Sequence, residues 1–121
     1  MLFRSQYLGY IPEADLPGLT AGAAVLFYPS LHEGFGFPVA QAMACGVPVL
    51  TSNVSALPEV AGEGAILADP RNRGDLSDSL ERLLLTPSLR EKIALAGSKR
   101  AGKYIWREVA QKSVEFFQSL G

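Results

Sequence analysis

Residues 23–51 combine four local patterns that few folds can accommodate together. The run Ala23–Tyr28 is short, apolar and unbroken, which is typical of a parallel strand buried on both faces, and Pro29 ends it. A glycine-rich stretch follows, then a short helical pattern at Val39–Cys45 and a second strand pattern at Val47–Thr51. A strand, loop, helix and strand in this order predict an α/β fold with a parallel sheet.

The loop between the first strand and the helix carries the strongest functional pattern, Glu33-Gly34-Phe35-Gly36-Phe37. Such a loop lies at the carboxyl end of a parallel sheet, where open α/β folds bind their ligands. Glycines let a ligand approach the backbone, and the N–H groups at a helix start favour an anion. The pattern predicts a site for a phosphorylated ligand; the alternative is that Glu33 only complements the helix dipole and the glycines only turn the chain.

These residues resemble the donor-binding signature of retaining, nucleotide-sugar-dependent glycosyltransferases of the GT-B fold, known as family 4 or glycosyl transferases group 1. The resemblance covers essentially this whole chain, but only about the last third of such an enzyme. The matching segments are Leu8–Pro12, Phe27–Ser30, Glu33–Gly46, Pro48–Ser52, Leu57–Gly62 and Asp69–Pro70. It implies that residues 1–121 form part of the C-terminal, donor-binding domain and that the acceptor domain is absent. The expected fold is half of a Rossmann-like domain: a short parallel sheet flanked by helices, with a C-terminal helical segment.

The resemblance also implies roles for the loop residues. A carboxylate at the position of Glu33 accepts hydrogen bonds from hydroxyls of the transferred sugar, which makes Glu33 the candidate catalytic residue. The backbone amides of Gly34, Phe35, Gly36 and Phe37 match those that approach the sugar and the diphosphate. This is chemically reasonable, because sugar hydroxyls need fixed acceptors and the departing diphosphate gains charge that oriented N–H groups stabilise.

Three further residues match positions that contact the nucleotide. Gln41 stands where the family usually has a second glutamate, which contacts the two ribose hydroxyls. The amide keeps an acceptor without the charge, so we expect nucleotide binding to be weaker by about tenfold. The alternative is a relaxed site in a chain that no longer catalyses. Tyr10 and Ile11 match a region that frames the base, or else they end a strand and pack.

Other polar residues have simpler explanations. His32 lies in the loop but has no charged partner in the sequence pattern, and Cys45 fits a small buried position at a helix end. Ser52, Asn53 and Ser55 are expected to form a turn near the ligand crevice. Histidine, cysteine and carboxylate residues do not occur at metal-ligand spacing, and the resemblance implies a mechanism without protein-bound metal. We therefore expect no cofactor, with a nucleotide-diphosphate sugar as the donor substrate.

The composition is that of a small α/β domain. Eleven Lys and Arg residues nearly balance 12 Asp and Glu residues, so we expect no nucleic-acid partner. A single cysteine excludes an internal disulfide, and no stretch is apolar over the ~20 residues that a membrane span needs. The start, Met1–Arg4, is too short and too soon polar for a signal peptide. These features predict a cytoplasmic location.

Local patterns predict the remaining elements. We expect a first strand near Phe3–Leu8, a helix from about Glu13 to Ala21, a helical turn at Pro58–Ala61 and a strand at Ala65–Leu67. The chain after Asn72 is expected to be helical, with Thr86 and Pro87 at the start of a further helix. Three apolar stripes at helical spacing are expected to pack in the core. They comprise Leu76, Leu80, Leu83 and Leu84; Leu89, Ile93 and Leu95; and Trp106, Val109, Ala110, Ser113, Val114 and Phe117.

Taken with the resemblance, these patterns favour the donor-binding portion of a transferase that moves a hexose-type sugar to an unknown acceptor. Alone, the chain should not be an efficient enzyme. The alternative is a non-catalytic sugar-nucleotide-binding or assembly subunit that completes a split transferase. A GT-B epimerase would be expected to carry further acid and base residues. The strand near Phe3–Leu8 lacks the neighbour that the family gives it, so we expect it to self-associate or to pair with a chain that supplies the missing GT-B half.

Overall fold

The computed structural model describes the backbone of residues 5–120 and their side chains except those of 103–113, 116 and 117. The three described strands form one parallel sheet in the order β1-β2-β3, flanked by helices as expected. In chain order the elements are η1 (Glu13–Asp15, a 3-10 helix), α1 (Leu16–Ala21), β1 (Leu26–Tyr28), α2 (Phe37–Ala44), β2 (Val49–Ser52), α3 (Leu57–Ala61), β3 (Ala65–Ala68), α4 (Arg73–Leu85) and α5 (Pro87–Leu120).

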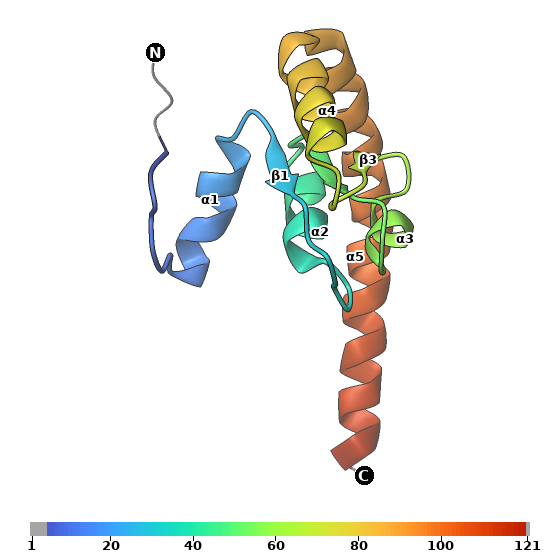
Figure 1. The fold of residues 1–121 in the computed structure, drawn as a ribbon. Helices are drawn as coiled ribbons and strands as arrows, with labels where there is room; N and C mark the ends of the chain where they lie inside the picture. The colour runs from blue at the N-terminus through green and yellow to red at the C-terminus, as the bar shows by residue number, and fades with distance from the viewer. Residues whose placement is uncertain (1–4, 121) are drawn as a thin grey trace.

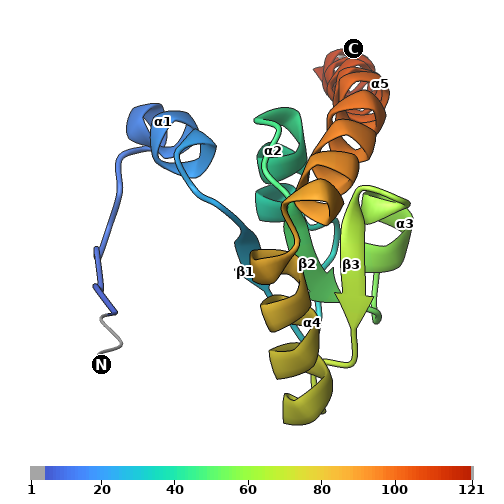
Figure 2. The same cartoon turned by 90° about the horizontal axis from the view of Figure 1, so that it is seen from above.

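The sheet lies between two helical layers (Figure 2), with α4 on one face and α2, α3 and part of α5 on the other. Successive residues of a strand point to opposite faces, so β2 contributes to two separate cores. Val49 packs among buried residues of α2 and α3 and Ala101 of α5. Leu50 packs with Ala68 of β3 and Leu83 of α4. The central strand is thus covered on both sides.

Helix α5 approaches the sheet layer closely where two glycines meet. A Cβ on Gly64 would lie 2.6 Å from the Cα of Gly97 and 2.8 Å from Cε of Met43, so the backbones touch without intervening side chains. One helical turn further along α5, the guanidinium of Arg100 donates to the backbone carbonyl oxygens of Glu59 and Val60 at the end of α3. These contacts fix α5 against α3 and β3.

The strand expected near Phe3–Leu8 is not present in its described part. Ser5 to Leu8 has no strand structure and is exposed, and residues 1–4 lie outside the described residues. A parallel strand needs a neighbour to satisfy its N–H and C=O groups, and within the described residues none pairs with this segment. The prediction was therefore wrong for Ser5 to Leu8. Figure 1 shows this segment and α1 standing apart from the sheet, on the side of β1.

Strand β1 is shorter and less buried than its sequence predicted. Only three residues of the apolar run form the strand, and the side chain of Phe27 is 41% exposed. The prediction of burial on both faces was wrong for Phe27 because β1 is an edge strand of the described sheet. All four residues of β2 are buried, so the fully covered strand is the second one, at the centre.

The burial of residues in the helical half of the chain also differs from the sequence prediction. Leu83 is buried as expected, but Leu84 is 46% exposed and Leu95 is 59% exposed, so these two are not core residues. The second and third apolar stripes lie on a single helix, α5, whose C-terminal half extends beyond the sheet in Figure 1. Most side chains of the third stripe lie outside the described residues; Val114, which is described, is exposed, contrary to expectation.

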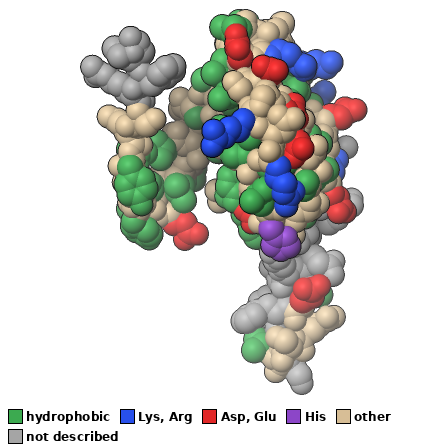
Figure 3. All heavy atoms as spheres, in the orientation of Figure 1, with side chains coloured by type: hydrophobic (Ala, Val, Ile, Leu, Met, Phe, Trp, Pro, Cys, Tyr) green, Lys and Arg blue, Asp and Glu red, His purple; other side chains and the backbone are tan. Residues whose placement is uncertain are grey.

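The face of the molecule shown in Figure 3 carries mixed charge and exposed apolar side chains. On the face shown in Figure 3, Lys and Arg side chains are interspersed with Asp and Glu side chains, and hydrophobic side chains gather on the N-terminal part. The large exposed apolar residues there are Tyr7, Leu8, Tyr10 and Leu19. Among the described helices, none is long and apolar enough to cross a membrane.

Candidate functional site

Three loops meet at one edge of the sheet. Since all the strands are parallel, the connections that follow them lie together at their carboxyl ends. These connections are residues 29–36, 53–56 and 69–72, which we call the β1–α2 loop, the β2–α3 loop and the β3–α4 loop. The β1–α2 loop contains Glu33 and the glycines, as the sequence predicted.

Glu33 is held at both its side chain and its backbone. The hydroxyl of Tyr28, the last residue of β1, donates to Oε1 of the Glu33 carboxylate. The hydroxyl of Ser55 accepts from the Glu33 N–H (3.1 Å) and donates to the Glu33 carbonyl oxygen (2.8 Å). A carboxylate accepts at both oxygens, so Oε2 retains acceptor capacity for a ligand hydroxyl. The half-buried Glu33 is therefore an acceptor in a fixed position.

The two glycines of the loop are explained differently. Gly36 is buried at the start of α2, has a φ of 88°, and a Cβ there would lie 2.7 Å from Cδ2 of Leu57. The fold itself therefore requires glycine at this position. Gly34 is exposed, has no positive φ, and a Cβ there would meet no protein atom within 4 Å. Packing within the protein gives no reason for glycine at position 34, whereas a closely approaching ligand would.

Helix α2 presents the other predicted residues of this region. It begins at Phe37, two residues before the predicted start, and in the described structure no side chain caps its first turn. The rings of Phe35 and Phe37 lie 4.8 Å apart between centroids, with Phe35 against the core and Phe37 half exposed. Gln41 is also exposed and follows Phe37 by one helical turn, so both lie on the same face of α2. The helix thus places Gln41 on the same side as the exposed ring of Phe37.

Tyr10 and Ile11 lie in a different part of the molecule. Tyr10 is 89% exposed and Ile11 half-buried, in the segment that precedes η1. In Figure 1 this segment lies beyond α1 as seen from the sheet, so the structure does not bring these two residues together with Glu33. Their role in framing a nucleotide base stays a prediction.

His32 and Cys45, the weaker candidates from the sequence, each take part in a contact between a side chain and a backbone carbonyl oxygen. His32 is exposed, and its carbonyl oxygen accepts from the Ser30 hydroxyl at 3.1 Å. The thiol of Cys45 is half-buried and lies 3.9 Å from the Pro17 carbonyl oxygen, a weak contact that joins α2 to α1. A search of the described residues finds no group of three or more His, Cys, Asp or Glu side chains that could hold a metal ion.

Sequence reasoning missed the residues that support the loop. The hydroxyl of Thr51 donates to the Tyr28 carbonyl oxygen at 2.7 Å, and the hydroxyl of Ser52 donates to the Ser30 carbonyl oxygen. Both side chains are fully buried at the end of β2. The sequence pattern predicts only a turn at Ser52 and Ser55. The available signal was two hydroxyl residues that end an otherwise apolar buried strand, where a hydroxyl needs a hydrogen-bond partner.

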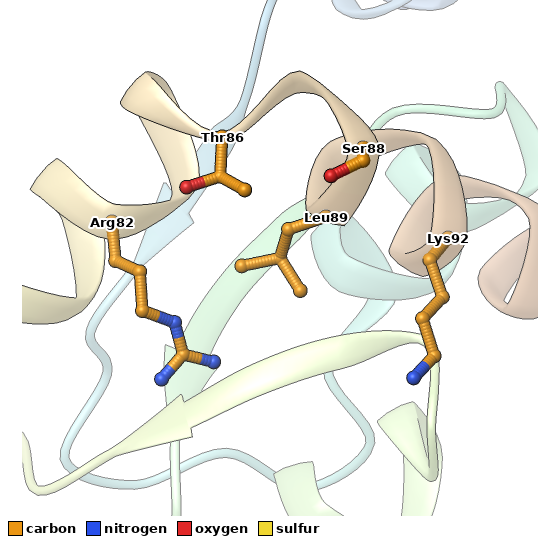
Figure 4. Close-up of a pocket in the computed structure, with 5 residues that line it drawn as sticks. All are labelled: Arg82, Thr86, Ser88, Leu89 and Lys92. Carbon is orange, nitrogen blue, oxygen red and sulfur yellow. The ribbon is translucent and has the colours of Figure 1, made fainter.

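A separate hollow lies at the junction of α4 and α5 (Figure 4). Helix α4 starts after the carboxyl end of β3 and packs along the sheet, so its end lies toward the opposite edge from Glu33. The hollow contains none of the predicted site residues, and its two basic side chains are exposed. Its lining residues are Arg82, Thr86, Ser88, Leu89 and Lys92.

The parallel sheet between helical layers, with a glycine loop at its carboxyl edge, defines an open α/β domain. The solved structure of sucrose-phosphate synthase from Thermosynechococcus elongatus superposes on it with a TM-score of 0.83 and 27% identity, over 95% of this chain and 30% of that chain. The glycosyl transferases group 1 family matches residues 4–100. The chain belongs to this family and corresponds to the C-terminal part of a GT-B glycosyltransferase.

Two relatives refine this comparison. The O-antigen chain mannosyltransferase B of Escherichia coli is 40% identical over 115 residues, which is 95% of this chain and 30% of that protein. The MMP alpha-(1->4)-mannosyltransferase of Mycolicibacterium hassiacum is 37% identical over 112 residues, which is 89% of this chain and 27% of that protein. The chain therefore spans less than a third of the length of the proteins that it matches here.

Proposed function

We propose that this chain is the donor-binding portion of a nucleotide-sugar-dependent retaining glycosyltransferase, and that the transferred hexose is mannose. The choice of mannose is supported by the names of both relatives described above, which are mannosyltransferases. The proposed donor is a nucleoside diphosphate sugar, and the proposed location is the cytoplasm. The binding site for the acceptor is proposed to lie in the part of the GT-B fold that this chain does not contain.

The observation that carries the proposal is the contrast between Gly34 and Gly36. The space beside Gly34 is open, and the preceding residue of the loop, Glu33, has a carboxylate held by the Tyr28 hydroxyl. In the proposed complex, Glu33 accepts a hydrogen bond from a sugar hydroxyl, and the backbone at Gly34 lies against the sugar and the diphosphate. The uncapped start of α2 adds the positive end of a helix dipole, which favours the phosphate groups.

This arrangement suits the chemistry of glycosyl transfer. The bond between the sugar C1 and the diphosphate oxygen breaks, and the bonding electrons leave with the diphosphate. C1 forms a bond to the oxygen of the acceptor hydroxyl, and the proton of that hydroxyl passes to the departing diphosphate. Negative charge therefore grows on the diphosphate, where a helix start stabilises it. Glu33 acts as a catalytic residue in the sense that it contacts the sugar and fixes its position at the reacting centre.

The rest of the site needs a second part of the GT-B fold, which we propose as the partner of this chain. The free edge of β1 is the proposed contact, because its outer side is unpaired within the described sheet and Phe27 is partly exposed there. The exposed apolar residues of the N-terminal segment would gain cover from the same partner. Self-association through Phe3–Leu8 stays a prediction; in the single chain, Ser5 to Leu8 is exposed and is not a strand.

The test is a titration of the 121-residue chain with GDP-mannose, UDP-glucose and ADP-glucose, followed by two-dimensional NMR. We expect amide shifts at residues 33–41 on adding a sugar nucleotide, and weaker binding by about tenfold in Gly34→Ala, because an added methyl group obstructs a close contact. The matched control is Gly18→Ala in α1, where the Cβ also has open space. Equal affinity of the two variants would refute the site at Gly34.

A non-catalytic subunit that completes a split transferase is the second candidate, and Gln41 is the observation that favours it. An amide at this position lacks the charge of the glutamate that the family usually has there. The two candidates differ in turnover once the missing GT-B part is added. Binding of a sugar nucleotide without sugar transfer by the assembled protein would favour the non-catalytic role.

A further inference from the structure

One neighbouring segment, residues 51–55, supplies hydrogen-bond donors to the backbone of residues 28–33. Three hydroxyls, which we call the hydroxyl series, donate to three carbonyl oxygens of residues 28–33. Thr51 donates to Tyr28, Ser52 to Ser30 and Ser55 to Glu33, with sequence separations of 23, 22 and 22 residues. The end of β2 and the β2–α3 loop therefore run alongside the β1–α2 loop and supply its partners in order.

Ser55 occupies a conformation that its residue type rarely adopts. Its φ is 61°, and it is the one described residue other than glycine with a positive φ. Glycine would adopt this conformation with less strain, so the backbone alone does not favour serine here. The Ser55 hydroxyl, however, makes two hydrogen bonds to the backbone of Glu33, which glycine could not make. Backbone strain of this kind concentrates at functional sites.

The first residue of α3, directly after the β2–α3 loop, supports the far end of the glycine turn. Leu57 is fully buried at the start of α3, and its Cδ2 occupies the space that a Cβ on Gly36 would need. Ser55 and Leu57 thus contact Glu33 and Gly36, at either side of the exposed Gly34. A shift of the β2–α3 loop would move both contacts together.

We propose that Ser55 is a positioning residue that aims the Glu33 carboxylate at the sugar of a nucleotide-sugar donor, with Thr51 and Ser52 fixing the preceding residues of the loop. The proposal rests on the proposed function and adds residues that bind no ligand themselves. The Tyr28 hydroxyl donates a hydrogen bond to the Glu33 carboxylate itself. The Ser55 hydroxyl binds the backbone of Glu33 and so fixes the main chain that carries this carboxylate. The hydroxyl series therefore acts on recognition of the transferred sugar through Glu33, whereas the proposed ribose contact, Gln41, lies on α2 beyond the residues that the series binds.

Two substitutions at one position test this. Ser55→Ala removes the hydroxyl and keeps the strained φ, whereas Ser55→Gly removes both. Ser55 is exposed and borders no core, so we expect both variants to fold, with Ser55→Gly having the higher melting temperature. In both, hydrogen exchange of the Glu33 amide should speed up by about tenfold, and GDP-mannose affinity should fall by about three- to tenfold. Affinity for GDP, which has the ribose but lacks the mannose, should change by less than about twofold.

Two substitutions at the buried residue Thr51 give a second test. Thr51→Val keeps the shape but cannot donate to the Tyr28 carbonyl oxygen, whereas Thr51→Ser keeps the hydroxyl. We expect Thr51→Ser to retain the wild-type affinity for GDP-mannose and Thr51→Val to lose affinity. Equal affinities in the two Thr51 variants would remove Thr51 from the hydroxyl series.

Three outcomes would overturn the role of Ser55: unchanged exchange at Glu33, wild-type affinity for GDP-mannose in Ser55→Gly, or equal losses for GDP-mannose and GDP. A wild-type chain that binds none of the sugar nucleotides refutes the proposed function, and sugar positioning with it. Failure of the Ser55 proposal alone is recognised differently, because the wild-type chain then binds GDP-mannose and neither Ser55 variant changes that binding.

Discussion

The β1–α2 loop and the α4–α5 half of the molecule are held in place by different interactions. The loop depends on side-chain hydroxyls that bind backbone groups about 22 residues away, and much of it is exposed. Helices α4 and α5 depend on buried apolar contacts, with Leu83 in one core and Ala101 in the other. A contact in the loop should therefore affect ligand binding more than stability, and a contact in the helices should do the reverse.

The largest expected effect is on stability in the helical half. Leu83→Ala removes a fully buried side chain and should lower the free energy of unfolding by about 2–5 kcal/mol. Leu84→Ala, one residue along and partly exposed, is the control and should change it by roughly 0.5 kcal/mol or less. Urea denaturation measures both. Similar losses in the two variants would contradict the burial assigned to α4.

Glu33 tests the opposite half of the comparison. Glu33→Ala should reduce sugar transfer by the assembled transferase at least about tenfold, since a hydrogen bond to a charged group contributes about 1.5–3 kcal/mol. Glu33→Gln keeps an acceptor for Tyr28 and isolates the contribution of the charge. The urea midpoint of either variant should stay close to that of the wild type. Unchanged turnover in a folded Glu33→Ala variant would remove Glu33 from the site.

The close contact of β3 with α5 gives an intermediate effect. In Gly64→Ala, the new methyl group would lie 2.6 Å from the Cα of Gly97, so the backbones must separate. We expect a loss of about 1–3 kcal/mol in the free energy of unfolding. Gly102 lies on α5, as Gly97 does, and a Cβ there would meet no atom within 4 Å. Gly102→Ala should therefore raise the free energy of unfolding by about 0.5–1 kcal/mol. The melting temperature should fall in Gly64→Ala and rise in Gly102→Ala.

The smallest effect is expected at Gln41. If this exposed residue of α2 faces the ribose, Gln41→Glu should tighten nucleotide binding at neutral pH by on the order of 1 kcal/mol. Calorimetric titration with GDP measures the difference, and thermal unfolding should be unaffected. Flat or weaker binding would mean that position 41 does not contact the ribose, and it would favour the relaxed, non-catalytic alternative.

The sequence alone determined the elements whose signals are local. Helix starts and ends were predictable at Pro87 and at Gly46, whose φ of 73° ends α2 as a glycine can, because caps and turns act within a few residues. The parallel sheet followed from the alternation of apolar runs and helical patterns. The loop with Glu33 was predictable for the same reason, since it is continuous in sequence and bounded by those elements.

Only the tertiary structure decided which apolar residues are covered and what supports the loop. Phe27 and Leu95 follow buried patterns but are exposed, because burial depends on which neighbours the sheet and helices have. The Ser5–Leu8 segment is not a strand, since a strand needs a partner that local sequence cannot reveal. Ser55 resembles an ordinary turn residue until folding brings its hydroxyl to Glu33, 22 residues away, by a contact that no local pattern encodes.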